Sequence, residues 1–106
     1  MNSYQRKYLK GAAHRLKPVA FVGQKGVTGS LIRSIDAALD SHELIKVKFV
    51  DFKEKARKGE MAETLAASTG AEMIGIIGHV AIFYRQHADP QKRKIRVPER
   101  QGETNR

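Results

Sequence analysis

The chain contains no cysteine among its 106 residues. This absence excludes disulfide bonds and every metal site that depends on thiolate ligands. No apolar run approaches the roughly 20 residues that a transmembrane helix requires, and no apolar signal segment follows the first residue. We therefore expect a cytoplasmic protein that has no membrane partner.

Acidic residues are missing from residues 1–28, which hold six basic residues. From residue 85 onward the chain has seven basic and three acidic residues, while residues 73–84 carry no charge. The net charge of +9 is therefore concentrated at the two ends of the chain. Such a distribution is typical of proteins that bind a polyanion.

Clusters of catalytic or metal-binding residues are also lacking. The four histidines are far apart in the sequence, and their spacing matches no compact pair of metal ligands: His14, His42, His79 and His87. The pattern suggests no pair of nucleophile and base, and the acidic residues are scattered. We expect a protein that is not an enzyme and has no metal site, no cofactor and no small-molecule substrate.

Aromatic residues make up only 7% of the chain. Most of them fit core positions, Phe21 included, and no aromatic pair on a strand suggests a platform for stacking bases. This favours binding through the nucleic-acid backbone, which positions a protein on its ligand but discriminates sequence poorly.

A Gly-x-x-Gly stretch, Gly23-Gln24-Lys25-Gly26, lies where an apolar run over residues 19–22 meets an amphipathic run that opens at Thr28. Glycine at such a junction lets backbone N–H groups approach phosphate oxygens, and Lys25 supplies positive charge. KH domains clamp single-stranded nucleic acid with a loop of this kind. An ordinary tight turn is the alternative interpretation of the tetrapeptide alone.

Hydrophobic periodicity predicts three helices and four strands. The helices are expected over residues 4–16, over 29–41, and from 51–54 to 69. The strands are expected over residues 19–22, 45–50, 72–77 and 80–84. Helix ends are predicted from an N-cap at Ser3, an N-cap at Thr28, a capping box of Asp51 with Glu54, and a terminating glycine at Gly70.

This order, α-β-α-β-α-β-β, predicts an α/β fold of the α+β sandwich type. Alternating strands and helices require crossovers, and Gly78-His79 suits a hairpin turn, so the four-stranded sheet should be mixed and packed by helices. We expect one monomeric domain over residues 1–85 and a mobile basic tail over 86–106. The tail could be a solubilising extension or an arm that contacts phosphates.

The chain resembles the CRM domain (chloroplast RNA splicing and ribosome maturation) in its stand-alone bacterial form, the YhbY family. The resemblance covers positions 5–85 and rests on five stretches in order: QRKYLKG, AHRLKP, GQKGVT, HELIKVK, and TGAE running to IGH and Tyr84-Arg85. It implies an RNA-binding module with a KH-like GxxG loop. It also implies a fold similar to the C-terminal domain of bacterial translation initiation factor three.

The resemblance further implies binding to ribosomal RNA in precursors of the large ribosomal subunit, as an assembly factor. The alternatives are a general RNA chaperone or splicing-type factor and, in a different class, a protein–protein adaptor with a basic face. The predicted RNA-binding residues, from the basic pattern and the resemblance together, are Arg6, Lys7, Lys10, His14, Arg15, Lys17, Gly23, Gln24, Lys25, Gly26, Thr28 and Arg85.

Overall fold

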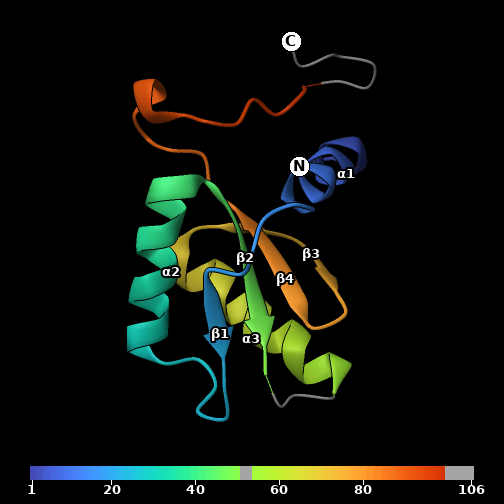
Figure 1. The fold of residues 1–106 in the computed structure, drawn as a ribbon, viewed down its shortest axis with the longest axis vertical. Helices are drawn as coiled ribbons and strands as arrows, with labels where there is room; N and C mark the ends of the chain where they lie inside the picture. The colour runs from blue at the N-terminus through green and yellow to red at the C-terminus, as the bar shows by residue number, and fades with distance from the viewer. Residues whose placement is uncertain (51–53, 100–106) are drawn as a thin grey trace.

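The computed structural model describes residues 1–50 and 54–99 of the chain. The predicted order of three helices and four strands is confirmed, and one turn of 3-10 helix follows it. The elements are α1 (Ser3–Ala13), β1 (Ala20–Val22), α2 (Gly29–His42), β2 (Leu44–Phe49), α3 (Lys55–Thr69), β3 (Glu72–Ile77), β4 (Val80–Tyr84) and the 3-10 helix η1 (Pro90–Lys92) (Figure 1). Within the described residues, no helix is both long enough and apolar enough to cross a bilayer.

The four strands form one mixed sheet, as predicted, in the order β1-β2-β4-β3. β1 and β2 run parallel because α2 connects them as a crossover. β4 lies between β2 and β3 and is antiparallel to both. The β3–β4 hairpin turns at Gly78, whose φ of 61° is in the left-handed region that glycine adopts at little cost.

Helices pack on both faces of this sheet, and each face has its own core. α2 and α3 pack on one face, where the larger core includes Leu39, Leu65, Phe49 and Phe83. α1 packs on the opposite face over a smaller core, formed by Leu9, Ala13, Leu44, Ile74, Ile82 and Tyr84. In Figure 1 α3 lies behind the strands and α1 lies beside their upper end. With 11 residues, α1 covers only one end of its face.

The boundaries of α1 differ from the prediction at both ends. Asn2 rather than Ser3 is the N-cap, because its side-chain oxygen accepts the Gln5 N–H at 3.1 Å while the Gln5 side chain accepts the Asn2 N–H at 3.1 Å. The helix ends at Ala13, three residues before the predicted end. Leu16 is therefore 39% exposed instead of belonging to the buried stripe of the helix.

The other helix ends follow the predicted signals where the structure describes them. Thr28 caps α2, and its hydroxyl oxygen accepts the Leu31 N–H at 3.1 Å. Gly70 ends α3 in the left-handed conformation, with a φ of 70°. The predicted capping box of Asp51 with Glu54 includes positions outside the described residues, and Glu54 itself makes no side-chain capping hydrogen bond.

Residues 86–99, which we call the C-terminal strap, lie against the domain through the carboxylate of Glu43. This side chain is 1% exposed and lies between α2 and β2. It accepts the backbone N–H groups of His87 at 2.7 Å, Lys94 at 2.5 Å and Ile95 at 3.0 Å. One buried side chain thus holds both ends of a nine-residue stretch of the strap, from His87 to Ile95.

The strap also packs on the side of the domain that carries α1. Ile95 and Val97 pack against the smaller core, and the Gln5 side chain donates to the Pro98 carbonyl at 2.9 Å. These contacts differ from the mobility that a polar, basic composition predicts for this stretch. The physical reason is that the apolar side chains of Ile95 and Val97 and the distant carboxylate of Glu43 anchor a segment most of whose other residues are exposed.

Candidate nucleic-acid interface

The Gly23–Gly26 stretch forms a hydrogen-bonded turn directly after β1. The Gly26 N–H donates to the Gly23 carbonyl at 2.9 Å, and Gly26 has a φ of 69° that disfavours other residues. Gln24 and Lys25 at its tip are exposed. No atom lies within 4 Å of the position that a Cβ on Gly23 would take. Packing within the protein therefore does not require glycine there, and the open space leaves the backbone accessible to a ligand.

The turn leads directly into the N-terminus of α2. Thr28 uses its hydroxyl group to cap this helix, so the hydroxyl is engaged within the protein. Helix N-termini carry a partial positive charge, which adds to the charge of the Lys25 ammonium group, four residues before the start of α2. The turn is therefore a short electropositive segment with an exposed backbone.

The predicted basic residues of the N-terminal region are all exposed. Arg6, Lys7 and Lys10 belong to α1, His14 is its C-cap, and Arg15 and Lys17 lie on the connection to β1. The stem of Lys10 lies across β3, because a Cβ on Gly75 would lie only 2.7 Å from Lys10 Cε. Gly75 adjoins a bulge in β3, and its lack of a side chain makes room for this lysine.

Lys46 fixes the position of the α1–β1 connection, a role that no pattern in the sequence indicates. Its ammonium group donates to the carbonyl oxygens of His14 and Leu16, both at 3.1 Å. The first carbonyl groups after a helix lack intrahelical partners, and a lysine is well suited to satisfy them. Arg15, which lies between these two carbonyls, is thereby held at the edge of the sheet.

The predicted site residues form two groups rather than one patch. Figure 1 shows α1 and the turn that follows β1 at opposite ends of the sheet. Residues 6–17 form the first group, and residues 23–28 form the second. β1 joins them, so an extended ligand that touches both groups must follow this edge of the sheet.

Arg85 lies apart from both groups and is engaged within the protein. Its guanidinium pairs with Asp36 and with Asp40, the latter at 2.9 Å, and donates to the carbonyl oxygens of Thr69 at 2.7 Å and Asp36 at 3.0 Å. These contacts tie the end of β4 to α2 and α3. We therefore leave Arg85 out of the proposed interface.

Phe21 is not a core residue, which corrects the sequence interpretation. It is 60% exposed, while Ala20 and Val22 on either side are buried in the larger core. β1 has only three residues, and strand side chains alternate between faces, so the middle residue must point away from α2 and α3. Alternation across Ala20-Phe21-Val22 was the signal that could have identified it.

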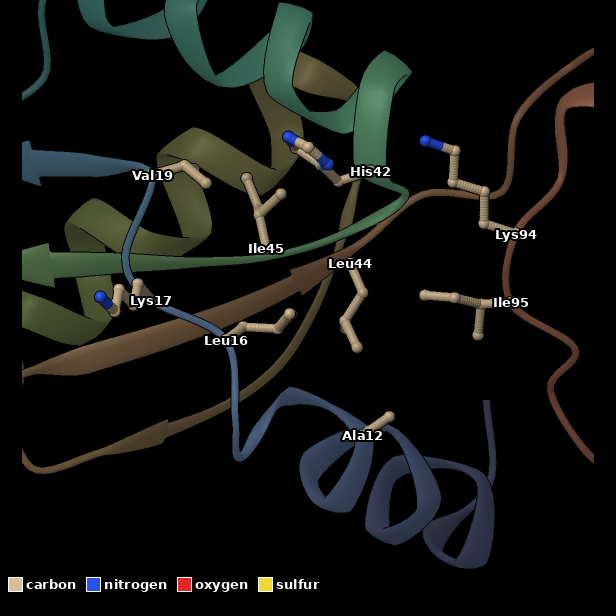
Figure 2. Close-up of a pocket in the computed structure, with 9 residues that line it drawn as sticks. All are labelled: Ala12, Leu16, Lys17, Val19, His42, Leu44, Ile45, Lys94 and Ile95. Carbon is tan, nitrogen blue, oxygen red and sulfur yellow. The ribbon is translucent and has the colours of Figure 1, made fainter.

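A pocket of about 440 Å³ lies between α1, β2 and the strap (Figure 2). Its walls are mainly apolar, and the nitrogen atoms of His42 and Lys94 lie on the same side of it. The residues that line it are Ala12, Leu16, Lys17, Val19, His42, Leu44, Ile45, Lys94 and Ile95.

Within the part of the chain that the structure describes, no group of three or more histidine, aspartate or glutamate residues could hold a metal ion. The two buried charged residues described there both have structural partners. Glu43 holds the strap, and Lys58 donates to the Gly78 carbonyl at 3.1 Å and lies 3.2 Å from Nδ1 of His79. The arrangement is chemically suited to binding an anion, through exposed cations and open backbone.

Similar proteins have been described in several bacteria. A Haemophilus influenzae protein named as an RNA-binding protein is 35% identical over 98 residues, which are 92% of this chain and 95% of that protein. The solution structure of a hypothetical Staphylococcus aureus protein, described as a candidate RNA-binding protein, matches with a TM-score of 0.77 and 31% identity. It covers 92% of this chain and 99% of that one.

The match with the Haemophilus protein is longer than 85 residues, so the similarity continues into the strap. The model of the CRS1 / YhbY (CRM) domain family matches residues 1–85, which include α1, all four strands and the Gly23–Gly26 turn. The chain therefore belongs to the CRS1/YhbY (CRM) domain family.

Proposed function

We propose that this protein binds RNA by contacting the RNA phosphate backbone with the Gly23–Gly26 turn and with the exposed basic side chains of residues 6–17. The observation that carries the proposal is the charge of residues 1–28, which include six lysine or arginine residues and no acidic residue. The fold leaves all six basic side chains exposed. Membership of the CRM family and the names of the relatives support it. Backbone N–H groups and ammonium groups together favour phosphate oxygens.

We further propose that the RNA is ribosomal, in precursors of the large subunit, and that the protein is a cytoplasmic, monomeric assembly factor rather than an enzyme. The family resemblance supports this choice. A protein that binds one RNA fold better than another stabilises that fold by mass action. An RNA chaperone or splicing-type factor would use the same surface, whereas an adaptor would use it for an acidic protein.

Salt dependence tests the phosphate contacts. For single strands, the slope of log K against log salt is roughly −0.7 for each phosphate neutralised. Because several of the six basic side chains should contact phosphates, we expect a slope of about −2 to −4 for a short single-stranded RNA. Fluorescence anisotropy at several salt concentrations measures it. Affinity that hardly changes with salt would contradict binding through phosphates.

Cell fractionation tests the ribosomal role. We expect the protein to co-sediment with precursors of the large subunit more than with mature ribosomes. RNase treatment of a pull-down provides the control, because an adaptor would keep its partners after the RNA is digested. Finding the protein only in the free fractions of the gradient would remove the support for an assembly factor while leaving RNA binding possible.

A further inference from the structure

One end of the sheet face that carries α1 is uncovered by the described residues. Four side chains lie in a row across it, one from each strand: Phe21, Lys48, Val80 and Ile77. Each is paired with its neighbour in the strand register, Phe21 with Lys48, Lys48 with Val80, and Val80 with Ile77. Phe21 is 60% exposed and Ile77 is 59% exposed. We call these four residues the open row.

The open row remains uncovered because α1 is short. The smaller core beneath α1 uses residues farther along the same face, Ile82 and Tyr84 of β4 and Leu44 of β2. After Ala13 the chain turns toward β1, and the two hydrogen bonds from Lys46 hold it there. An aromatic side chain, Phe21, and a large aliphatic one, Ile77, are therefore left in solvent on a folded sheet, with the half-buried Val80 between them and Lys48 in the row. Exposed apolar side chains on a sheet often mark a binding surface.

Positive charge borders the open row on both sides. Phe21 lies two residues before Gly23, so the turn with Lys25 begins where the row meets the edge of the sheet. The exposed ammonium of Lys48 lies in the row itself, beside Phe21. At the other border, Arg15 and Lys17 are exposed on the connection to β1. A ligand on this surface must combine negative charge with flat apolar groups.

A shallow hollow of about 170 Å³ continues the open row toward α1. Its floor is formed by Ile77, Val80 and Ile82, and His14 and Lys46 lie at its polar side. The surface thus offers one exposed ring at the β1 edge and one small apolar hollow near the end of α1. Between these two features the chain presents Lys48 rather than an acidic residue.

We propose that the open row is a binding site for unpaired bases of single-stranded RNA. One base stacks on the ring of Phe21 while its phosphate lies at the Gly23–Gly26 turn, and a neighbouring base lies in the hollow between His14 and Ile77. Single-stranded nucleic acid is the ligand that matches a basic border around an aromatic ring, because every base has a flat face and every linkage has a charge. The inference rests on the proposed RNA binding and adds that the RNA bound at this surface is single-stranded.

Substitution of Phe21 tests the site. The probe is a short single-stranded RNA that carries the fluorescent base 2-aminopurine, compared with a duplex RNA of the same length. We expect Phe21→Ala to weaken binding of the single strand by roughly 5- to 100-fold, the effect typical of losing one base–aromatic stack. Binding of the duplex and the salt slope should change little, because the phosphate contacts remain.

Two further variants separate stacking from other roles of the side chain. Phe21→Trp should keep the affinity and quench the 2-aminopurine signal, whereas Phe21→Leu, which keeps apolar bulk without a ring, should behave like Phe21→Ala. Thermal unfolding checks that all three variants are folded, as expected for substitutions at a position that is 60% exposed. If Phe21→Leu binds the single-stranded RNA as well as the parent does, the proposal that a base stacks on the ring of Phe21 is contradicted.

The remaining outcomes separate this inference from the function on which it rests. If the parent protein binds no RNA, both the proposed function and the role of the open row are overturned. A parent that binds RNA equally well with Phe21→Ala would overturn the open row alone and leave backbone binding intact. Sedimentation that shows a dimer of the parent and a monomer of Phe21→Ala would identify the row as a contact between two copies and overturn its role with RNA.

Discussion

Replacing Glu43 with glutamine is expected to lower the free energy of unfolding by about 3 kcal/mol and to release the strap. The carboxylate accepts three backbone N–H groups, from His87, Lys94 and Ile95, in a position that is 1% exposed. A glutamine keeps the size of the side chain but replaces one acceptor oxygen with a donor. At least one buried N–H group then faces an NH₂ group and loses its partner.

Hydrogen exchange and denaturant titration measure the two parts of this effect. The amides of His87, Lys94 and Ile95 should exchange faster in Glu43→Gln, and unfolding should occur at a lower urea concentration. Glu63→Gln is the matched control, because it removes the same charge from an exposed position on α3. Equal stability of Glu43→Gln and the parent would show that the carboxylate does not hold the strap.

The same carboxylate predicts how stability depends on pH. Burial pushes the pKa of Glu43 upward, but the N–H groups of His87, Lys94 and Ile95 and the charge of His87 outweigh burial and hold the pKa below its ordinary value of about 4.5. A group whose pKa is lowered on folding stabilises the protein above its unfolded pKa and loses this effect as the pH falls through its folded pKa.

The difference in stability between the parent and Glu43→Gln should therefore be full at neutral pH and should shrink below about pH 4.5. Urea titrations at a series of pH values measure it. A chain that ends at Arg85 serves as a second control, because without the strap the carboxylate has lost its three donors. A difference in stability between the parent and Glu43→Gln that stays constant across this pH range would contradict a lowered pKa of Glu43.

Local patterns were sufficient to predict the elements of the fold but not their long-range contacts. The alternation in residues 45–50, the glycine at position 70 and the cap at Thr28 are short-range signals, and the structure has each of them. The position of β4 between β2 and β3 depends on pairing between distant strands. No single stretch of sequence reports such pairing.

Most of the residues that the sequence did not reveal depend on partners far along the chain. Glu43 looks like a surface acid between a helix and a strand, and its donors lie 44 to 52 residues later. Arg85 looked like another basic residue of the RNA interface, but its guanidinium pairs with two acidic residues of α2, Asp36 and Asp40. Phe21 is the exception, because alternation within β1 alone places it on the open face.

The second large effect is expected at the turn. Replacing Gln24 and Lys25 together with aspartate should weaken RNA binding by roughly a hundredfold. The change puts two negative charges on the turn and removes the ammonium of Lys25, where phosphate oxygens are proposed to bind. Both side chains are exposed, and Gly23 and Gly26 keep their hydrogen bond, so stability should stay within about 0.5 kcal/mol of the parent.

Lys92→Ala is the matched control, because it removes an exposed charge from η1 at a distance from the turn along the chain. It should change the affinity only slightly. Comparing the turn variant with Phe21→Ala then separates two kinds of contact. The turn variant should weaken single-stranded and duplex RNA alike and reduce the salt slope, since it removes phosphate contacts. A folded turn variant that binds as well as the parent would make Gly23–Gly26 an ordinary turn and leave residues 6–17 as the contact surface.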